Sequence, residues 1–485
     1  MDSSVVSKRV FFLLFFLFLF TYTTFKFYVS DAMSAARTAL GIALVSEGTL
    51  RVDAYVHFFT HDSTFRDGHH YACQAPGSAL VALPTIALAH YSLKALGKDD
   101  FTAFDPRQPG VPSQAFGTVM LAGSLTISFF AALGAAMIYV LGIRFGVSQR
   151  TAVLVAVFFG LGTPYAMWAT VLMGHALVAA FLVIAFAWGE ALIRSRELGH
   201  GILVPGWLLT GFLLAFSVNV EYTAAIPAIV LGLTLLALMR RADLPWPRCW
   251  RIVGLLVLGA VPAAIFFFVY NALAFGSPFS LGYLQVADKH PLMEQGFAGV
   301  ALPKVSVLLK SLFSPRFGIL WFSPILILFP FAVYENLRQG FRRELNIACL
   351  SIVSYYFLLN ASYGYWFHSI NGPRHVTAAL PFAFIPFLFM DRWPSIFLRR
   401  AVWLLGGYSL VVFSFAMFVP MSEIYWREYS KIPSIIAAFF SGEIRNLFYY
   451  AGLPVPVAMI LPFLIWVTFG FLLWRTVRQE SEKKM

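Results

Sequence analysis

The chain is built from long apolar runs separated by short polar segments. A helix needs about 20 apolar residues to cross a bilayer, and windows of this length recur along the whole sequence. The pattern therefore predicts an all-α polytopic membrane protein with about 12 transmembrane helices. The predicted spans lie near residues 10–25, 116–143, 150–168, 174–193, 204–220, 222–239, 252–275, 316–334, 345–361, 376–391, 401–420 and 456–474.

The first apolar run has two interpretations. Lys8 and Arg9 precede it, as basic residues precede the apolar core of a secretory signal. The run is rich in phenylalanine, however, and continues through Lys26 without a small-residue cleavage site. This favours an uncleaved membrane anchor over a signal peptide.

Basic residues decide whether a weaker apolar run at 77–95, interrupted by Pro84, also crosses the membrane. Twenty of the 35 Lys and Arg residues lie near the N-terminus, in the shortest loops and in the C-terminal tail. The positive-inside rule places these segments in the cytoplasm. They share one side only if 77–95 does not cross. We therefore expect both termini inside, juxtamembrane helices in a long first outer loop (30–115), and further outer loops at 276–315 and 421–455.

The composition supports the membrane class. The 485 residues are 59% hydrophobic and 12% charged, with a mean hydropathy of +0.76, whereas soluble chains are about 25% charged. The net charge of +12 is a topology signal and not a nucleic-acid footprint, because the surplus lies mainly in the predicted cytoplasmic loops. Three widely separated cysteines exclude a disulfide framework and a CxxC metal motif.

Carboxylates are concentrated on the predicted outer side, which carries 14 of the 23 acidic residues. Asp31 directly follows the first span and begins a predicted helix. It has two interpretations: a helix N-cap, and a general base whose pKa is raised by partial desolvation at the membrane surface. The two roles are compatible.

The stretch from Arg51 to Tyr71 carries four histidines and three carboxylates, Asp53 among them. Imidazole and carboxylate groups can bind a divalent metal. The spacing matches no established metal motif, so no cofactor is predicted and metal binding stays the alternative. The histidines are interpreted as interfacial polar groups.

Ionisable residues near lipid are candidates for function because charge is expensive there. His175 and Glu221, the latter followed by Tyr222, lie in tight turns between predicted spans, where the alternative is a satisfied packing role. Arg316 and Arg374 lie at outer entrances to spans. A guanidinium can hold a phosphate there with two parallel hydrogen bonds, and the alternative is snorkelling to the interface.

Taken in order, these motifs resemble the GT-C superfamily of polytopic glycosyltransferases, which includes aminoarabinose transferases and protein O-mannosyltransferases that use polyprenyl-phosphate sugars. The resemblance extends to about residue 390, which divides the chain into a GT-C-like catalytic module, 1–390, and C-terminal transmembrane helices, 391–485. The motifs are Asp31 after the first span, Tyr71 with Pro76-Gly77, Gly162-Thr163-Pro164 before Gly174-His175, Glu221-Tyr222, Ser314-Pro315-Arg316 with Gly318, and Gly372-Pro373-Arg374.

The resemblance implies an inverting glycosyltransferase that takes a sugar from a polyprenyl-phosphate carrier on the non-cytoplasmic face of a bacterial inner membrane. By that likeness Asp31 would be the general base, and Arg374 with Arg316 would hold the carrier phosphate. The acceptor would be a hydroxyl of a lipid, a glycan or a protein. The residues implied around the sugar or the acceptor are Asp53, Tyr71, His175, Glu221 and Tyr222.

Two differences from protein O-mannosyltransferases narrow the choice of branch within the superfamily. Asp31 is followed by Ala32, where protein O-mannosyltransferases have paired acidic residues, and Ala75-Pro76-Gly77 replaces their His-Pro-Pro turn. These differences favour a bacterial-type branch. A 12-span secondary transporter and a non-catalytic membrane assembly subunit are the alternatives. The chain shows no matching halves and no ionisable residue at mid-span, which favours the transferase over the transporter.

Overall fold

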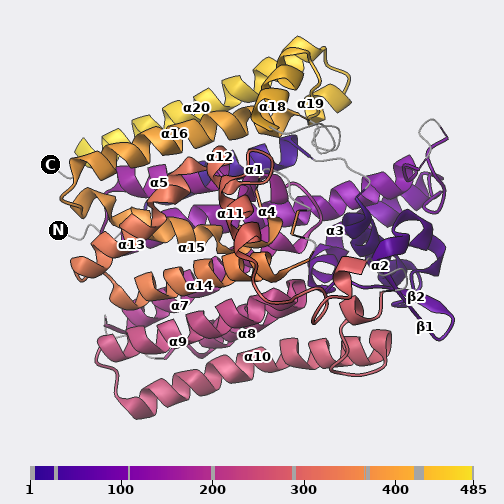
Figure 1. Cartoon of the computed structure of the whole chain (residues 1–485), viewed down its shortest axis with the longest axis horizontal. Coiled ribbons are helices and arrows are strands. Elements are labelled where there is room, and N and C mark those ends of the chain that lie inside the picture. Colours follow the sequence, from indigo (N-terminus) through magenta and orange to yellow (C-terminus); the bar gives the residue numbers. More distant parts are fainter. Residues whose placement is uncertain are drawn as a thin grey trace.

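The computed structural model describes residues 6–26, 31–106, 110–197, 202–286, 291–364, 366–367, 372–419 and 431–482. Long helices run side by side along one axis in this part of the chain (Figure 1). Seven described helical segments are long and apolar enough to cross a membrane. They are α4 (Gln114–Arg144), α7 (Gly174–Glu197), η3 (Tyr222–Ala224) continuing into α9 (Ala225–Arg241), α10 (Trp246–Phe275), α14 (Arg343–Ser362), α16 (Ile396–Phe418) and α20 (Val455–Glu482).

Shorter helices occupy three more of the predicted spans. They are α1 (Lys8–Thr24), α5 (Gln149–Leu161) and α8 (Val204–Val220). The predicted class, a helical polytopic membrane protein, is confirmed by this arrangement of long apolar helices. The count of 12 crossings stays a prediction.

Three predicted spans are interrupted. The 150–168 span ends in a separate short helix, α6 (Tyr165–Trp168). The 316–334 span consists of α12 (Ile319–Phe322), η6 (Pro324–Leu328) and α13 (Phe329–Arg338). The 376–391 span consists of η7 (Arg374–Ala379), α15 (Leu380–Phe384) and η8 (Ile385–Arg392). A proline lies at or next to the start of η6, α13, α15 and η8, and a proline immediately precedes α6 and η7. Proline lacks an N–H donor and crowds the preceding turn, and hydropathy alone does not reveal such breaks.

The first outer loop contains a hairpin that the all-α prediction did not include. Strands β1 (Ser63–Arg66) and β2 (His69–Ala72) pair antiparallel. Asp67 and Gly68 join them with φ values of 51° and 80°, and the Asp-Gly pair favours this two-residue turn. The rest of the loop is helical, with α2 (Ala32–Ser46), η1 (Asp53–Phe58), η2 (Thr60–Asp62) and α3 (Gly77–Ala95).

Helix α3 corresponds to the apolar run at 77–95 that the charge argument kept out of the membrane. It is not among the described helices that are long and apolar enough to span. It packs against α2 and α4 at the end of the bundle that carries the first loop (Figure 1). The start of α1 and the end of α20 lie together at the opposite end of the bundle, where Ser7 Oγ donates to Glu480 Oε1 at 2.6 Å.

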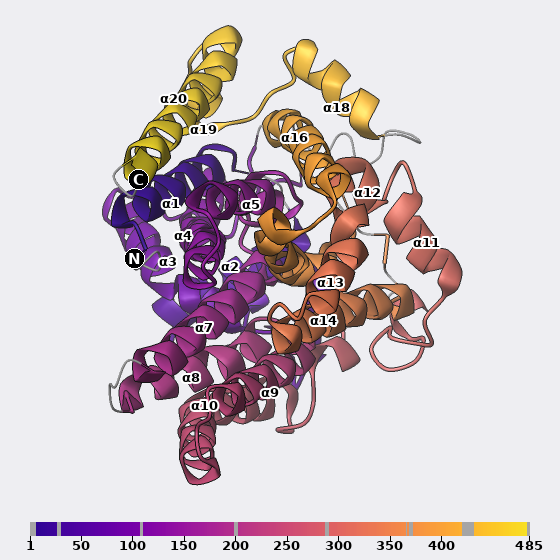
Figure 2. The same ribbon diagram turned by 90° about the vertical axis from the view of Figure 1, so that its left-hand side faces the viewer.

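Peripheral elements complete the described structure. Helices α11 (Val305–Phe313) and α18 (Lys431–Phe440) lie at the rim of the bundle (Figure 2). The remaining short elements are η4 (Gly282–Leu284), η5 (Pro291–Met293) and α19 (Leu447–Tyr450). Parts of the three predicted outer loops, residues 30, 107–109, 287–290 and 421–430, lie outside the described residues.

Two glycines allow α8 and α10 to approach closely. A Cβ atom on Gly211 would lie 2.0 Å from the carbonyl oxygen of Leu256, and one on Gly259 would lie 2.1 Å from that of Leu208. Small residues are the usual means of bringing membrane helices this close. The contact fixes α8, which ends at the turn that carries Glu221.

Candidate functional site

Asp31 begins helix α2 as its N-cap. Its Oδ1 atom accepts a hydrogen bond of 2.8 Å from the backbone N–H of Ser34. The Asp31 side chain is partly exposed. Burial raises the pKa of Asp31, against the opposing effects of the Ser34 hydrogen bonds and the Arg37 charge. A carboxylate of this kind is a stronger base than an exposed aspartate.

Arg37 lies less than two turns further along α2 and is buried, with 1% of its surface exposed. Its Nε donates to Ser78 Oγ at 2.8 Å, and its Nη1 donates to the carbonyl oxygen of Met33 at 3.0 Å. Its Nη2 lies 3.5 Å from Glu221 Oε1. One guanidinium therefore joins α2 to α3 and to the turn between α8 and α9.

Glu221 and His175, which lie in separate turns of the sequence, come together in the structure. His175 Nδ1 lies 3.7 Å from Glu221 Oε1, and both residues are buried. Gly174 makes room for this contact, because a Cβ there would lie 2.2 Å from Glu221 Oε1. The Gly-His sequence at the start of α7 is thus a packing requirement of the Glu221 carboxylate.

Arg374 reaches the same place from the start of η7. Its Nε donates to His375 Nε2 at 3.4 Å, and its Nη1 donates to Met33 Sδ at 3.6 Å. Burial, with the adjacent Arg374 charge, lowers the pKa of His375 well below its ordinary value, so that this ring is a neutral acceptor. The His375 and His175 rings lie 5.7 Å apart. Arg374 therefore contacts two neutral groups, and one of them, Met33, lies in the first turn of the helix that Asp31 caps.

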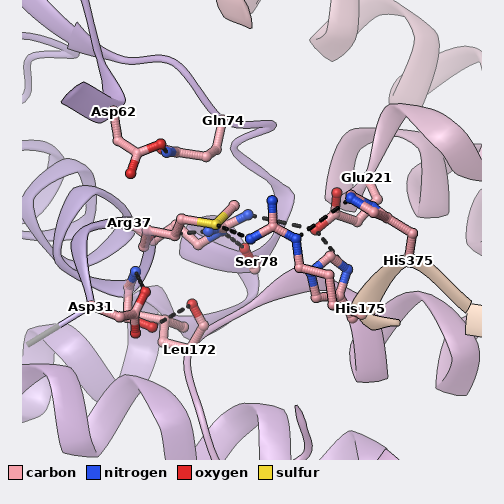
Figure 3. A network of polar contacts seen from close by, with 12 residues as sticks. Asp31, Arg37, Asp62, Gln74, Ser78, Leu172, His175, Glu221 and His375 are labelled. Carbon is pink, nitrogen blue, oxygen red and sulfur yellow. Dashed lines mark hydrogen bonds and ion pairs between the residues drawn. The ribbon is translucent and has the colours of Figure 1, made fainter. Parts of the chain in front are cut away.

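Asp62 is a second carboxylate in this network. Its Oδ1 accepts from Gln74 Nε2 at 2.9 Å. Burial raises the pKa of Asp62, Arg374 lowers it, and Asp31 raises it further, so these three charges lie within electrostatic reach of one another. Figure 3 shows Asp31 and Asp62 on one side of the network and Glu221, His175 and His375 on the other.

Sequence reasoning did not select Arg37, Asp62 or His375 as site residues. Arg37 carried a usable signal, because it is a lone cation in the otherwise uncharged helix Ala32–Ser46. Asp62 carried none, since it stands among several carboxylates and histidines of the same loop. Only the fold distinguishes it from its neighbours.

The other predicted residues lie elsewhere in the described structure. Asp53 braces the hairpin: its Oδ2 lies 2.9 Å from His69 Nδ1, and its Oδ1 accepts from the His70 backbone N–H at 2.6 Å. Tyr71 is buried in β2, opposite Thr64. Neither residue belongs to the network drawn in Figure 3. Tyr222 follows Glu221, and its ring lies 6.1 Å from that of Tyr283.

Arg316 belongs to a second cationic group, in the turn between α11 and α12. Its guanidinium and the Lys431 ammonium lie 5.0 and 5.4 Å from the centre of the Phe317 ring. Burial, with the Arg316 charge, lowers the pKa of Lys431 to about 7. Arg316 is thus separate from the described contacts that join Arg374 to α2.

The histidine-rich stretch of the first loop is not assembled as a metal centre in the described structure. His57 Nε2 contacts the carbonyl oxygen of Thr102 at 2.8 Å, while His69 and His70 are held by the hairpin contacts described above. Among the described residues, no three His, Cys, Asp or Glu side chains gather in a way that could hold an ion.

Comparison with known proteins gives structural likenesses only. No protein-family model matches the chain, and no curated protein matches it in sequence. ArnT of Cupriavidus metallidurans bound to undecaprenyl phosphate is similar at a TM-score of 0.47 and 13% identity, over 96% of this chain and 76% of that one. The apo oligosaccharyltransferase of Archaeoglobus fulgidus is similar at a TM-score of 0.44 and 14% identity, over 84% of this chain and 54% of that one.

Both likenesses stand at low sequence identity. With TM-scores below 0.5 they transfer no residue role to this chain. The site itself defines the class more closely: a polytopic helical membrane protein whose first loop and later turns bring carboxylates, arginines and neutral histidines together at one end of the bundle.

Proposed function

We propose that this protein is a membrane glycosyltransferase that moves a sugar from a polyprenyl-phosphate carrier to an acceptor hydroxyl at the non-cytoplasmic end of the bundle. In this reaction Asp31 acts as the base and Arg374 holds the carrier phosphate. The proposal is supported by the geometry at the start of α2 and by the order of motifs along the chain.

One observation carries the proposal. Arg374 Nη1 contacts Met33, two residues after the Asp31 cap, and its other described hydrogen bond is to neutral His375. Arg374 is partly exposed, and no described carboxylate lies at ion-pair distance from it. A cation with neutral partners beside a partly exposed carboxylate suits a reaction in which one group receives a proton and the other receives a phosphate.

The step requires few groups because the phosphate already activates the anomeric carbon. Asp31 Oδ2 takes the proton of the acceptor hydroxyl while the acceptor oxygen forms a bond to that carbon. The bond from the anomeric carbon to the phosphate oxygen breaks, and its electron pair leaves with the phosphate. The additional negative charge develops on the carrier phosphate, where the Arg374 guanidinium offsets it.

The remaining residues have supporting roles in this proposal. Arg37 and Glu221 hold α2 against the turn between α8 and α9, and His175 completes that contact. Asp62 lies within electrostatic reach of Asp31 and is available to orient the acceptor. Arg316 stays a predicted second contact for the carrier, separate from the Arg374 site.

Sugar transfer by the purified protein in lipid nanodiscs tests the proposal. Asp31→Asn retains an N-cap oxygen and removes the base, so we expect transfer from a polyprenyl-phosphate sugar to fall about 10²- to 10⁴-fold. Asp67→Asn, in the exposed hairpin turn where asparagine is favoured, is the matched control and should transfer at the wild-type rate. Equal rates for Asp31→Asn and wild type would remove Asp31 from the chemistry.

A further inference from the structure

Four tyrosines lie within electrostatic reach of one another beside the site. We define this tyrosine face as Tyr222, Tyr270, Tyr283 and Tyr363. The rings of Tyr222 and Tyr283 lie 6.1 Å apart, and the Tyr363 ring lies 4.8 Å from that of His375. The face therefore starts next to Arg374, the proposed holder of the carrier phosphate, and continues toward α10.

Helix α10 supplies the far part of the face. The Tyr222 ring lies 5.7 Å from that of Phe267 on this helix. Tyr270 follows Phe267 by three residues, which places the two on the same side of the helix. The first outer loop holds the segment that carries Tyr283, because Thr64 Oγ1 in that loop donates to the carbonyl oxygen of the preceding residue, Gly282, at 3.1 Å. The tyrosine face is thus assembled from segments far apart in sequence.

Polar atoms on this face lack partners. No described residue bonds the hydroxyls of Tyr222 and Tyr270 or the side-chain oxygen of Asn271, the residue after Tyr270. Tyr270 and Asn271 are only 3% and 1% exposed. Buried polar groups in native proteins nearly always have a partner, so several orphans in one place mark a missing one. Tyr222, Tyr283 and Tyr363 are partly exposed and leave one side of the face accessible.

The charges around the face restrict what that partner can be. Glu221 is the carboxylate that borders it, and Arg37 and His175 already contact its Oε1 atom. Arg66, near the end of α10, is paired with Asp67 at 3.0 Å. Arg374 and Asp62 also lie within electrostatic reach of Tyr363, but in the proposed reaction Arg374 is occupied by the carrier phosphate and Asp62 by the acceptor. A charged group placed on the tyrosine face would therefore lose its water without gaining a free opposite charge, which is costly.

We propose that the tyrosine face binds the sugar ring of the donor and selects a neutral, hydroxylated sugar over an amino sugar or a uronic acid. Aromatic rings provide apolar area for the faces of a sugar, and phenol and amide groups supply hydrogen bonds to its hydroxyls. The inference rests on the proposed function, because the sugar reaches the face through the phosphate held by Arg374.

Binding measurements in nanodiscs test this inference. The ligands are polyprenyl phosphate alone and the same carrier with a neutral hexose, an amino sugar or a uronic acid. We expect the neutral hexose alone to tighten binding to the wild type relative to the bare carrier. Tyr222→Phe and Tyr270→Phe should each lose about three- to tenfold of that gain, as expected for one hydrogen bond. Their affinity for the bare carrier should not change.

Tyr139→Phe is the matched control, because Tyr139 is a buried tyrosine of α4 whose hydroxyl instead accepts from Gln149. Its sugar preference should equal that of the wild type. Full retention of the gain in both site variants, or equal binding of a charged sugar, would overturn the inference. So would a loss in these variants of acceptor kcat/KM alone, which would assign the face to the acceptor. Failure of the bare carrier to bind would instead overturn the proposed function, and the inference with it.

Discussion

Two polar regions of the first outer loop are similar in composition and differ in construction. The network around Asp31 joins α2, α3, the turn between α8 and α9, and η7 through buried side chains. The hairpin region around Asp53 is also rich in carboxylates and histidines, yet Asp53 contacts residues only 16 and 17 positions away, and its side chain is 41% exposed. Convergence of distant segments, and not the local density of titratable residues, marks the site.

The largest stability difference between the two regions is expected at their carboxylates. Glu221→Ala leaves the buried Arg37 guanidinium without its opposite charge, which should lower the free energy of unfolding by about 3 kcal/mol or more. Asp53→Ala removes an exposed pair and should cost less than about 1 kcal/mol. Denaturant unfolding of both variants in detergent checks this. Equal losses would contradict the distinction between the two regions.

A smaller loss of stability is expected from a substitution at Gly174. A Cβ there would lie 2.2 Å from Glu221 Oε1, so Gly174→Ala must displace the carboxylate from Arg37. We expect a loss of about 1–3 kcal/mol, together with reduced transfer. Gly232→Ala is the control, because nothing lies within 4 Å of a Cβ at that position in α9. The thermal midpoint of the control should stay level or rise, and a Gly174 variant that behaves like the control would show that Glu221 has room to move.

The smallest effect, of opposite sign in the two regions, is expected from aspartate-to-asparagine changes. Burial raises the pKa of Asp31 in the folded state, so its ionised form opposes folding above the ordinary aspartate pKa, and this cost disappears as pH falls. Asp31→Asn should therefore match or exceed wild-type stability at pH 7, by at most about 1 kcal/mol. Asp53→Asn should be slightly destabilising, because an amide nitrogen replaces one of the two side-chain oxygens that contact His69 and His70. Thermal midpoints at pH 7 and at lower pH test both signs, and a clear loss for Asp31→Asn would contradict the account.

Much of the fold could be predicted from the sequence because lipid imposes strong constraints on it. Apolar length and basic loops identified the long helices and kept 77–95 out of the set that spans. The interruptions at 316–334 and 376–391 were missed because hydropathy is insensitive to the backbone hydrogen bonds that proline removes. The hairpin was missed although the Asp67-Gly68 pair signals such a turn.

The site was predictable only in part. Asp31 could be placed at a helix start, and the order of motifs brought forward His175, Glu221 and Arg374, which the fold collects around α2. Asp62 became distinguishable only through its position relative to Arg374 and Asp31. Asp53 was also selected from the sequence, and in the structure it braces the hairpin. A role for Asp53 at the sugar or the acceptor stays a prediction. Local sequence does not encode which polar residues meet across the bundle.

The central claim is that Arg374 holds the carrier phosphate next to Asp31, and the affinity for bare polyprenyl phosphate tests it most directly. Arg374→Gln should weaken binding about 10- to 100-fold, as loss of a charge-assisted hydrogen bond predicts. Asp31→Asn should bind as tightly as the wild type, and Arg316→Gln should show a smaller effect than Arg374→Gln. Wild-type affinity in Arg374→Gln would contradict the account.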